Sequence, residues 1–529
     1  MRKNLIKVIM VAVVAFGFAA CTKDLDRSPF YDVTSASVYN DFANYKQILA
    51  KVYAGLAVSG QSGPSGRPDI SGIDEGFSTY FRQYWQMQEL TTDEAVIAWN
   101  DGTIQDLHKM TWTPTNEFIT AMYNRFYYQI SLANEFIRET SDDKLNSRGI
   151  TGSNLDDAKR FRAEARFMRA LSYSHAIDLF GNIPFVTELD KVGSFFPQQK
   201  SRAEVFEYVE GELLDLESQL AEPGQNEYGR ADKGAAWMLL ANLYLNAKVY
   251  TGTERYTDAI TYAKKVIGAG YTLEPEYKNL FLADNNLSNE IIFPIVFDGQ
   301  HTRSFGGMTY LVHAPVGGNM NKEDFGINGG WAGLRTTKNI VNLFPTTDAS
   351  VDSRGMFHTS GQTLDINDLG TFTEGFPITK FKNVDRNGNM GSDKSGDHPD
   401  TDFPLFRLAE AYLIYAEAVV RGGTGGDVAT AVGYVNDLRE RAYGNTSGNI
   451  SQGELTLDFL LNERARELNW EAKRRTDLIR FGKYTGSNYL WPWKGGVAEG
   501  RAVEDTRVLF PIPSADITAN PNLDQNAGY

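Results

Sequence analysis

The feature that most constrains the fold is a series of segments whose apolar residues recur with the period of an α-helix. The clearest is GAAWMLLANLYLNAKVYTG, which starts at residue 234. Its apolar side chains follow the i, i+3, i+4, i+7 spacing of one helical face: Ala236, Leu239, Leu240, Leu243, Tyr244 and Ala247. The next segment, YTDAITYAKKVIGAG, has Ala259, Ala263 and Val266 on one face, so it is expected to pack against the first as an antiparallel partner.

The same spacing occurs on both sides of this pair. The stretch DDAKRFRAEARFMRALSYSHAIDLFGNIP predicts a long helix that ends at Gly181, because Pro184 prevents its continuation. Further helices are predicted in PLFRLAEAYLIYAEAVVRGG, in DVATAVGYVNDLRERAYG and in FLLNERARELNWEAKRRTDLIRFG. Helix pairs with small inward-facing alanines are similar to tetratricopeptide (TPR) hairpins, although the period of about 34 residues is not kept. The predicted fold class is therefore mainly α, with irregular TPR-like helix pairs.

A glycine-rich stretch between residues 271 and 403 interrupts the helical pattern. The glycines that break up its short apolar runs include Gly306, Gly307, Gly317, Gly318, Gly326, Gly329, Gly330 and Gly333. This composition predicts a loop-rich insertion with short strands, and long loops on a rigid scaffold commonly carry function. We therefore expect five regions: a signal peptide at 1–20, a tether with N-terminal binding loops at 21–116, a TPR-like helical region at 117–270, a ligand-binding insertion at 271–403, and a C-terminal helical region with a tail at 404–529.

The N-terminus has the order of a bacterial lipoprotein signal. Arg2, Lys3 and Lys7 precede an apolar run over residues 8–18, and Ala19-Ala20 then lead to Cys21, the only cysteine in the chain. The run is shorter than the roughly 20 residues that span a bilayer. A lone cysteine cannot form an intramolecular disulfide, so Cys21 is expected to carry lipid and to anchor the protein in a membrane.

Charge and motif content exclude several functions. The formal net charge is −15, and removal of residues 1–20 would take away three positive charges, which disfavours binding to nucleic-acid backbones. The chain contains no GxSxG, HExxH or GxxxxGK[ST] motif, and its histidines do not cluster. We therefore do not expect an enzyme, although Asp93 and Glu94, with Glu89 nearby, leave a glycoside hydrolase open as an alternative.

Two tryptophans lie in turn-rich stretches, where packing in a core explains them poorly. Trp99 precedes the turn signal Asn100-Asp101-Gly102, and Trp331 follows Gly329-Gly330. Flat aromatic faces suit the apolar C–H face of a sugar ring, while planar donors and acceptors suit its hydroxyls. Other tryptophans, such as Trp237 and Trp470, lie in helical patterns and are expected to be core residues, as is His175.

Several stretches together resemble the SusD/RagB family. They are RFRAEARFMRALSYSHAIDLFGNIPF, GRADKGAAWMLLANLYLNAKVYTG, FPLFRLAEAYLIYAEAVV, ERARELNWEAKRRTDLIRFG and the terminal LFPIPSADITANPNLDQNAGY. The resemblance implies a lipoprotein on the outer membrane of Bacteroidetes that faces the cell exterior, with TPR-like helices that cradle a loop-rich subdomain. It also implies nutrient binding without catalysis, and a SusC-like TonB-dependent channel as partner.

The resemblance extends to the ligand-contacting stretches of the starch-binding member of that family. These are similar to DISGIDEGFSTYFRQYW, ELTTDEAVIAW, GGMTYLVH and GGWAGLR. The glycan-binding positions that it implies are Asp74, Arg82, Trp99, Asn100, Asp101, Tyr310 and Trp331. Ile97 departs from the pattern, because the starch-binding member has a second tryptophan there, so the ligand could be starch or a related oligosaccharide.

The resemblance also implies a structural calcium, with Asp284 and Asp402 as its possible ligands; no other cofactor is expected. A second function remains open at this point, a TPR-type scaffold that binds peptides or proteins. Such a scaffold would have a concave groove with polar clamps and no exposed arc of tryptophans.

Overall fold

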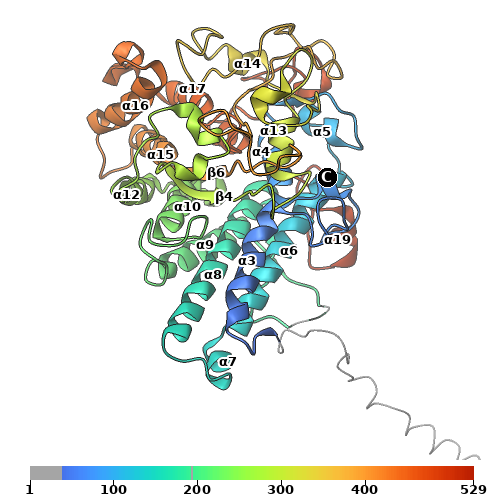
Figure 1. Cartoon of the computed structure of the whole chain (residues 1–529), viewed down its shortest axis with the longest axis vertical. Coiled ribbons are helices and arrows are strands. Elements are labelled where there is room, and N and C mark those ends of the chain that lie inside the picture. Colours follow the sequence, from blue (N-terminus) through green and yellow to red (C-terminus); the bar gives the residue numbers. More distant parts are fainter. Residues whose placement is uncertain (1–37, 192, 194) are drawn as a thin grey trace, which may run out of the picture.

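The structure, a computed structural model, describes residues 38–191, 193 and 195–529. The predicted signal peptide and Cys21 lie outside the described residues. Among the residues that are described, no helix has both the length and the apolar composition needed to cross a membrane. Figure 1 shows long helices in the lower half of the molecule and a loop-rich region above them.

The chain is mainly helical, as predicted. Its α-helices are α3 (Ala43–Ala57), α4 (Tyr80–Glu89), α5 (Ile104–Lys109), α6 (Glu117–Glu139), α7 (Asp142–Ser147), α8 (Ser153–Phe180), α9 (Arg202–Leu216), α10 (Lys233–Leu245), α11 (Ala247–Thr251), α12 (Tyr256–Ile267), α13 (Gly307–His313), α14 (Lys338–Val341), α15 (Leu408–Val420), α16 (Val428–Tyr443), α17 (Leu457–Glu467), α18 (Arg474–Arg480) and α19 (Ser514–Ala519). The strands are β1 (Val96–Ile97), β2 (Ile183–Pro184), β3 (Gln199–Lys200), β4 (Ile291–Ile295), β5 (Leu334–Arg335) and β6 (Phe403–Arg407).

The predicted helix pairs form and pack in sequence order. Helix α6 packs on α8, α8 on α9, α10 on α12, α12 on α15, and α15 on α16. Helix α8 ends where the sequence predicts, because Gly181 adopts a φ of 71° that favours glycine. Asp427 caps α16 as its position suggests, its carboxylate accepting the Thr430 N–H at 2.8 Å.

Short strands attach the loop-rich segment to the helices. Strands β4 and β6 pair antiparallel and are buried, so the chain enters and leaves this segment at neighbouring points. Strand β1, which follows α4, pairs with β5, which lies within the loop-rich segment. This pair joins the N-terminal loops to that segment. The sheets therefore serve as attachment points, and the helices carry most of the core.

One predicted helix is divided. The stretch FLLNERARELNWEAKRRTDLIRFG was expected to form a single helix, but α17 ends at Glu467 and α18 begins at Arg474. Between them Trp470 and Ala472 adopt φ values of 61° and 59°. The Trp470 backbone N–H donates to Glu94 at 2.7 Å, and its indole N–H donates to the Glu94 carbonyl at 2.8 Å. The first of these contacts satisfies a backbone N–H that a continuous helix would have bonded internally.

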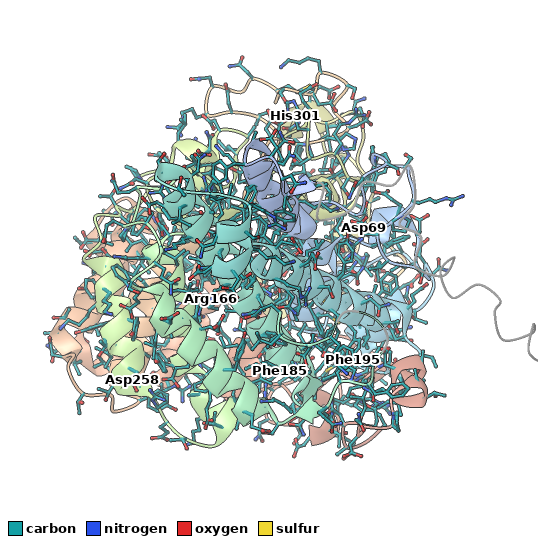
Figure 2. All side chains as sticks on the ribbon, turned by 90° about the horizontal axis from the view of Figure 1, so that it is seen from below. Asp69, Arg166, Phe185, Phe195, Asp258 and His301 are labelled. Carbon is teal, nitrogen blue, oxygen red and sulfur yellow. The ribbon has the colours of Figure 1, made fainter. Side chains whose placement is uncertain are left out.

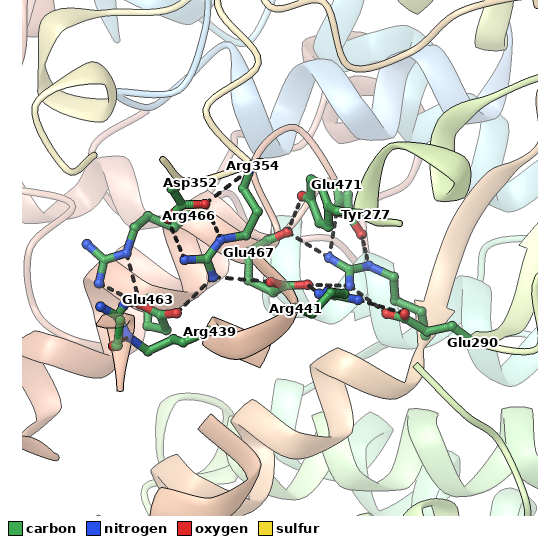
Figure 3. Close-up of polar contacts among 12 residues, drawn as sticks. Tyr277, Glu290, Asp352, Arg354, Arg439, Arg441, Glu463, Arg466, Glu467 and Glu471 are labelled. Carbon is green, nitrogen blue, oxygen red and sulfur yellow. Dashed lines mark hydrogen bonds and ion pairs between the residues drawn. The ribbon is translucent and has the colours of Figure 1, made fainter. Parts of the chain in front are cut away.

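A buried network of charges fixes the loop-rich segment to the C-terminal helices (Figure 3). Arg354 pairs with Asp352 at 2.7 Å and with Glu463 at 2.8 Å, and Arg407 pairs with Glu467 at 2.7 Å and with Glu471 at 2.6 Å. Burial alone would raise the pKa of Glu463, but the surrounding arginines lower it to about 2. The surrounding cations thus favour the ionised form of Glu463, and likewise lower the pKa of Glu467 and of Glu471.

Candidate functional site

A cavity of about 590 Å³ opens between three walls. One wall is the loop over residues 64–68, a second comes from residues 73–77 with Arg82 of α4, and the third is formed by Trp99, Phe305 and Trp331. The loop is tied to α3 through an ion pair of 3.0 Å between Lys51 and Asp69. Figure 2 shows Asp69 far from Asp258, which lies on α12 in the helical part. The cavity therefore belongs to the N-terminal loops and the loop-rich segment.

The pairing of β1 with β5 brings the two tryptophans together. Ile97 lies opposite Leu334 in this pair, and the strand continues in a hydrogen bond of 2.9 Å from the Ala98 N–H to the Gly333 carbonyl. The indole N–H of Trp99 donates to the backbone carbonyl of Trp331 at 3.0 Å. The two ring centroids are 6.2 Å apart and the ring planes are inclined at 48°. The cavity thus has two adjacent aromatic faces that are not parallel.

The ring of Trp331 is supported from behind by His313. The two rings stack with centroids 4.8 Å apart and planes inclined at 27°. The Trp331 N–H donates to the His313 carbonyl at 2.9 Å, and the His313 Nδ1 lies 2.7 Å from the Gly329 carbonyl oxygen. Burial lowers the pKa of His313, which keeps the imidazole neutral at physiological pH. The loop 329–333 is therefore held by α13.

Arg82 supplies a buried cation to the cavity. Its side chain is 3% exposed, and one Nη1 hydrogen bond of 2.8 Å reaches the Gly76 carbonyl. Its Nε and Nη2 atoms are buried and have no hydrogen-bond partner among the described residues. The guanidinium lies 4.3 Å from the Phe77 ring centroid and 4.1 Å from that of Tyr310. Burial lowers its pKa to about 10, so Arg82 stays charged at neutral pH.

Asp74 adds an acceptor at the edge of the same cavity. It caps the short 3-10 helix Glu75–Phe77, and its Oδ1 accepts the Gly76 N–H at 2.9 Å. Its side chain is exposed, which leaves the second carboxylate oxygen accessible. The neighbouring Glu75 is buried and bonded to the Ser59 hydroxyl. Four of the residues suggested by the resemblance, Asp74, Arg82, Trp99 and Trp331, thus line one cavity.

The other three suggested residues do not line it. Tyr310, on α13, is 0% exposed and packs beneath Arg82 and Trp99, with its ring centroid 6.0 Å from that of Trp99. In this structure Tyr310 therefore supports the site from below rather than facing a ligand. Asn100 and Asp101 are exposed beside the cavity, and Asp101 acts on it through its charge, which raises the pKa of Arg82 against the effect of burial.

The sequence interpretation missed two aromatic walls, Phe77 and Phe305. Phe77 lies in the matched stretch DISGIDEGFSTY and Phe305 directly precedes Gly306, so both were within reach of a search for aromatic residues beside glycines. Ile97, where the starch-binding pattern has a tryptophan, is 1% exposed in β1. An isoleucine there packs in the core and adds no face to the cavity.

Asp93 and Glu94, the carboxylates that suggested a glycoside hydrolase as an alternative, are bonded to buried groups of the protein. Asp93 is 0% exposed and accepts two hydrogen bonds from the Arg474 guanidinium, at 2.8 and 2.7 Å. Glu94 holds the backbone of Trp470 at 2.7 Å. Neither residue lines the cavity. The sequence-based assignments of His175 and Trp470 to the core are confirmed, with side chains 7% and 0% exposed.

The two suggested calcium ligands have other partners. Both Asp284 oxygens accept hydrogen bonds from Arg386, at 3.2 and 2.7 Å. Asp402 is buried and accepts the Phe297 N–H and the Tyr228 hydroxyl, both at 2.7 Å. Within residues 38–191, 193 and 195–529, no three His, Cys, Asp or Glu side chains are grouped so that they could hold a metal ion. Asp284 and Asp402 therefore do not fit a calcium site in this structure.

Comparison with known proteins finds family models and solved structures that match this chain. A family model described as "SusD family" matches residues 358–529, and a second, "Starch-binding associating with outer membrane", matches residues 29–245. Among solved structures, a SusD superfamily protein from Bacteroides thetaiotaomicron aligns with a TM-score of 0.70 at 23% identity, covering 92% of this chain and 99% of that one. Surface glycan-binding protein A from the same organism, solved in complex with laminarihexaose, aligns with a TM-score of 0.69 at 19% identity over 92% of this chain and 99% of that one.

Similarity in sequence is stronger. The starch-binding protein SusD of Bacteroides thetaiotaomicron is 37% identical, and the alignment covers 100% of this chain and 99% of that protein. SusD-like protein P2 of Formosa agariphila is 27% identical over 81% of this chain and 84% of its own length. With its helical scaffold, its inserted loops and a full-length relative at this level of identity, the chain belongs to the SusD family.

Proposed function

We propose that this protein is a surface lipoprotein that captures starch-like or related oligosaccharides and delivers them to a SusC-like TonB-dependent channel in the outer membrane. The observation that carries the proposal is the cavity, in which two tryptophan faces stand beside an arginine. The full-length relative is named as starch-binding, and one matching family model is described as associating with the outer membrane.

The geometry of the rings favours a curved glucan. Successive sugars of a flat, ribbon-like chain present parallel faces, whereas those of a helical chain turn relative to one another. The planes of Trp99 and Trp331 are inclined at 48° with centroids 6.2 Å apart, which suits a chain that turns between neighbouring sugars. The Arg82 guanidinium can donate to hydroxyls at the middle of such a chain, and the Asp74 carboxylate can accept from them.

The carboxylates of the cavity support binding without hydrolysis. A glycosidase needs two carboxyl groups on opposite sides of the scissile bond. The carboxylates that line this cavity, Asp74 and Glu75, are neighbours in sequence, and Glu75 is buried against Ser59. They lie on one wall, which is the arrangement of a binding site.

Attachment to the membrane is proposed through Cys21. Cys21 follows the apolar run over residues 8–18 and Ala19-Ala20, which is the order of a bacterial lipoprotein signal.

Isothermal titration with maltooligosaccharides tests the binding proposal, with cellooligosaccharides as the flat-chain comparison. Trp331→Ala should weaken binding of a maltooligosaccharide at least fivefold, since a stacked ring contributes about 1 kcal/mol or more. Trp237→Ala is the matched control, because Trp237 is partly buried on α10 and does not line the cavity. Equal binding by the parent and Trp331→Ala, or no binding of any glucan, would contradict the proposal.

A further inference from the structure

We propose that Gly333 is a positioning residue for ligand binding, because the side chain it lacks leaves the space that the Trp99 indole occupies beside Trp331. The inference rests on the proposed function in one respect, that Trp99 is a ring on which the ligand stacks. Gly333 does not itself line the cavity, but it determines the orientation of the Trp99 ring, which does.

The three atoms nearest to this space all belong to the Trp99 ring. A Cβ atom at position 333 would lie 2.5 Å from Cε2, 2.6 Å from Cζ2 and 2.9 Å from Nε1 of Trp99. Carbon atoms that are not bonded settle at separations of roughly 3.5–4.0 Å. A methyl group at 333 is therefore incompatible with the present position of the Trp99 ring.

The backbone at this position cannot move away easily. The Gly333 N–H donates to the Ala314 carbonyl at 2.7 Å, and its carbonyl accepts the Ala98 N–H at 2.9 Å. The following N–H, of Leu334, also donates to Ala314 at 2.9 Å, and β5 then pairs with β1. The chain is thus held from both sides, by α13 and by β1. The ring of Trp99, which is only partly buried and lines a cavity, is the group with room to move.

Displacing the Trp99 ring would also disrupt the hydrogen bond that holds it to Trp331. The new methyl group would crowd Nε1, the atom through which Trp99 donates to the Trp331 carbonyl at 3.0 Å. The ring would then swing into the cavity, and the angle of 48° between the two aromatic faces would change. A ligand would lose its stacking on Trp99 and part of its space.

The requirement for glycine here is one of space and not of backbone angle. Gly333 is absent from the residues with positive φ, although its neighbour Ala332 has a φ of 48°. Alanine therefore suits the backbone at 333, and its effect would report on the ring. Gly329, four residues earlier in the same loop, provides the matched control, because a Cβ there would have no atom within 4 Å.

The test combines titration with NMR of the indole N–H groups. Full-length protein labelled with ¹⁵N-tryptophan gives one indole signal for each of its 8 tryptophans, and the Trp99 signal is assigned by its loss in Trp99→Phe. In Gly333→Ala the Trp99 indole signal should shift, while in Gly329→Ala it should stay in place. Gly333→Ala should also bind maltooligosaccharides at least roughly fivefold more weakly than the parent, and Gly329→Ala should bind normally.

A double-mutant comparison shows whether the effect passes through the ring. On a Trp99→Ala background, Gly333→Ala should cause no further loss of affinity, because the group it displaces is gone. An unmoved indole signal, unchanged binding by Gly333→Ala, or an equal loss on the Trp99→Ala background would overturn the inference. If the parent binds no glucan, the proposed function fails, and the indole signal alone then decides whether Gly333 positions Trp99.

Discussion

Replacing Arg82 with methionine should abolish ligand binding without the loss of stability that usually follows the removal of a buried arginine. Burial lowers the pKa of Arg82 from 12.5 to about 10, which corresponds to about 3 kcal/mol against its charged form. Its contacts with the rings of Phe77 and Tyr310 return about 0.5–1 kcal/mol each. The hydrogen bond of 2.8 Å from its Nη1 to the Gly76 carbonyl offsets about 1.5–3 kcal/mol more, so the arginine is close to neutral for stability. A thioether packs well against the same two rings.

The expected result is a free energy of unfolding equal to that of the parent or up to about 1 kcal/mol higher, measured by urea denaturation. Affinity for maltooligosaccharides, measured by titration, should fall at least tenfold, since hydrogen bonds from a charged group contribute about 1.5–3 kcal/mol.

Arg474→Met is the matched control. This arginine is also buried, at 2% exposure, but it donates to both oxygens of Asp93, at 2.8 and 2.7 Å. Its loss leaves a buried carboxylate without its partner and should cost about 3–5 kcal/mol. If Arg82→Met proved as destabilising as Arg474→Met, or if it bound glucan as the parent does, the interpretation of Arg82 as an unpaired ligand-binding cation would be refuted.

Three further outcomes are expected. The pKa of Glu463 lies at about 2, below its ordinary value of 4.5, so the stability it contributes is complete above about pH 4.5 and should be lost as the pH falls towards 2. Glu463→Gln should therefore cost about 3–5 kcal/mol at pH 7 and flatten this dependence in acid titrations of unfolding. Because the carboxylates of Asp284 and Asp402 have protein partners, EDTA or added calcium should leave the melting temperature unchanged, and a clear rise with calcium would contradict this. Cys21→Ala should give a folded protein that no longer partitions into membranes, and retention of the variant in the membrane fraction would refute lipidation.

Local patterns were sufficient to predict the helices whose partners lie nearby in the chain. The apolar spacing of residues 234–247 and 256–266 predicted both α10 and α12 and their contact, because the two faces that bury each other are close in sequence. The same approach failed at α17 and α18, where Glu94 holds Trp470 across 376 positions of sequence. A local sequence pattern does not reveal a hydrogen-bond partner that lies so far away in the chain.

The cavity, too, could be predicted from the sequence only in part. Resemblance identified Trp99 and Trp331, and the turn signals beside them already placed them in loops. Burial of Tyr310 depends on how α13 packs against α4, which periodicity does not determine. The aromatic walls Phe77 and Phe305 acquire their role only when residues 73–77 and the segment before α13 meet.

The pairing of β1 with β5 has a consequence for how the molecule folds. Trp99 meets its partner 232 positions later, and Asp93 meets Arg474 only after 381. A chain with such high contact order closes long loops before those contacts are gained, so it should fold slowly for a protein made mainly of helices. The nascent N-terminal half would have no completed binding cavity of its own. Deleting the chain from α18 onward should therefore disturb a site whose ligand-facing residues all lie before residue 332.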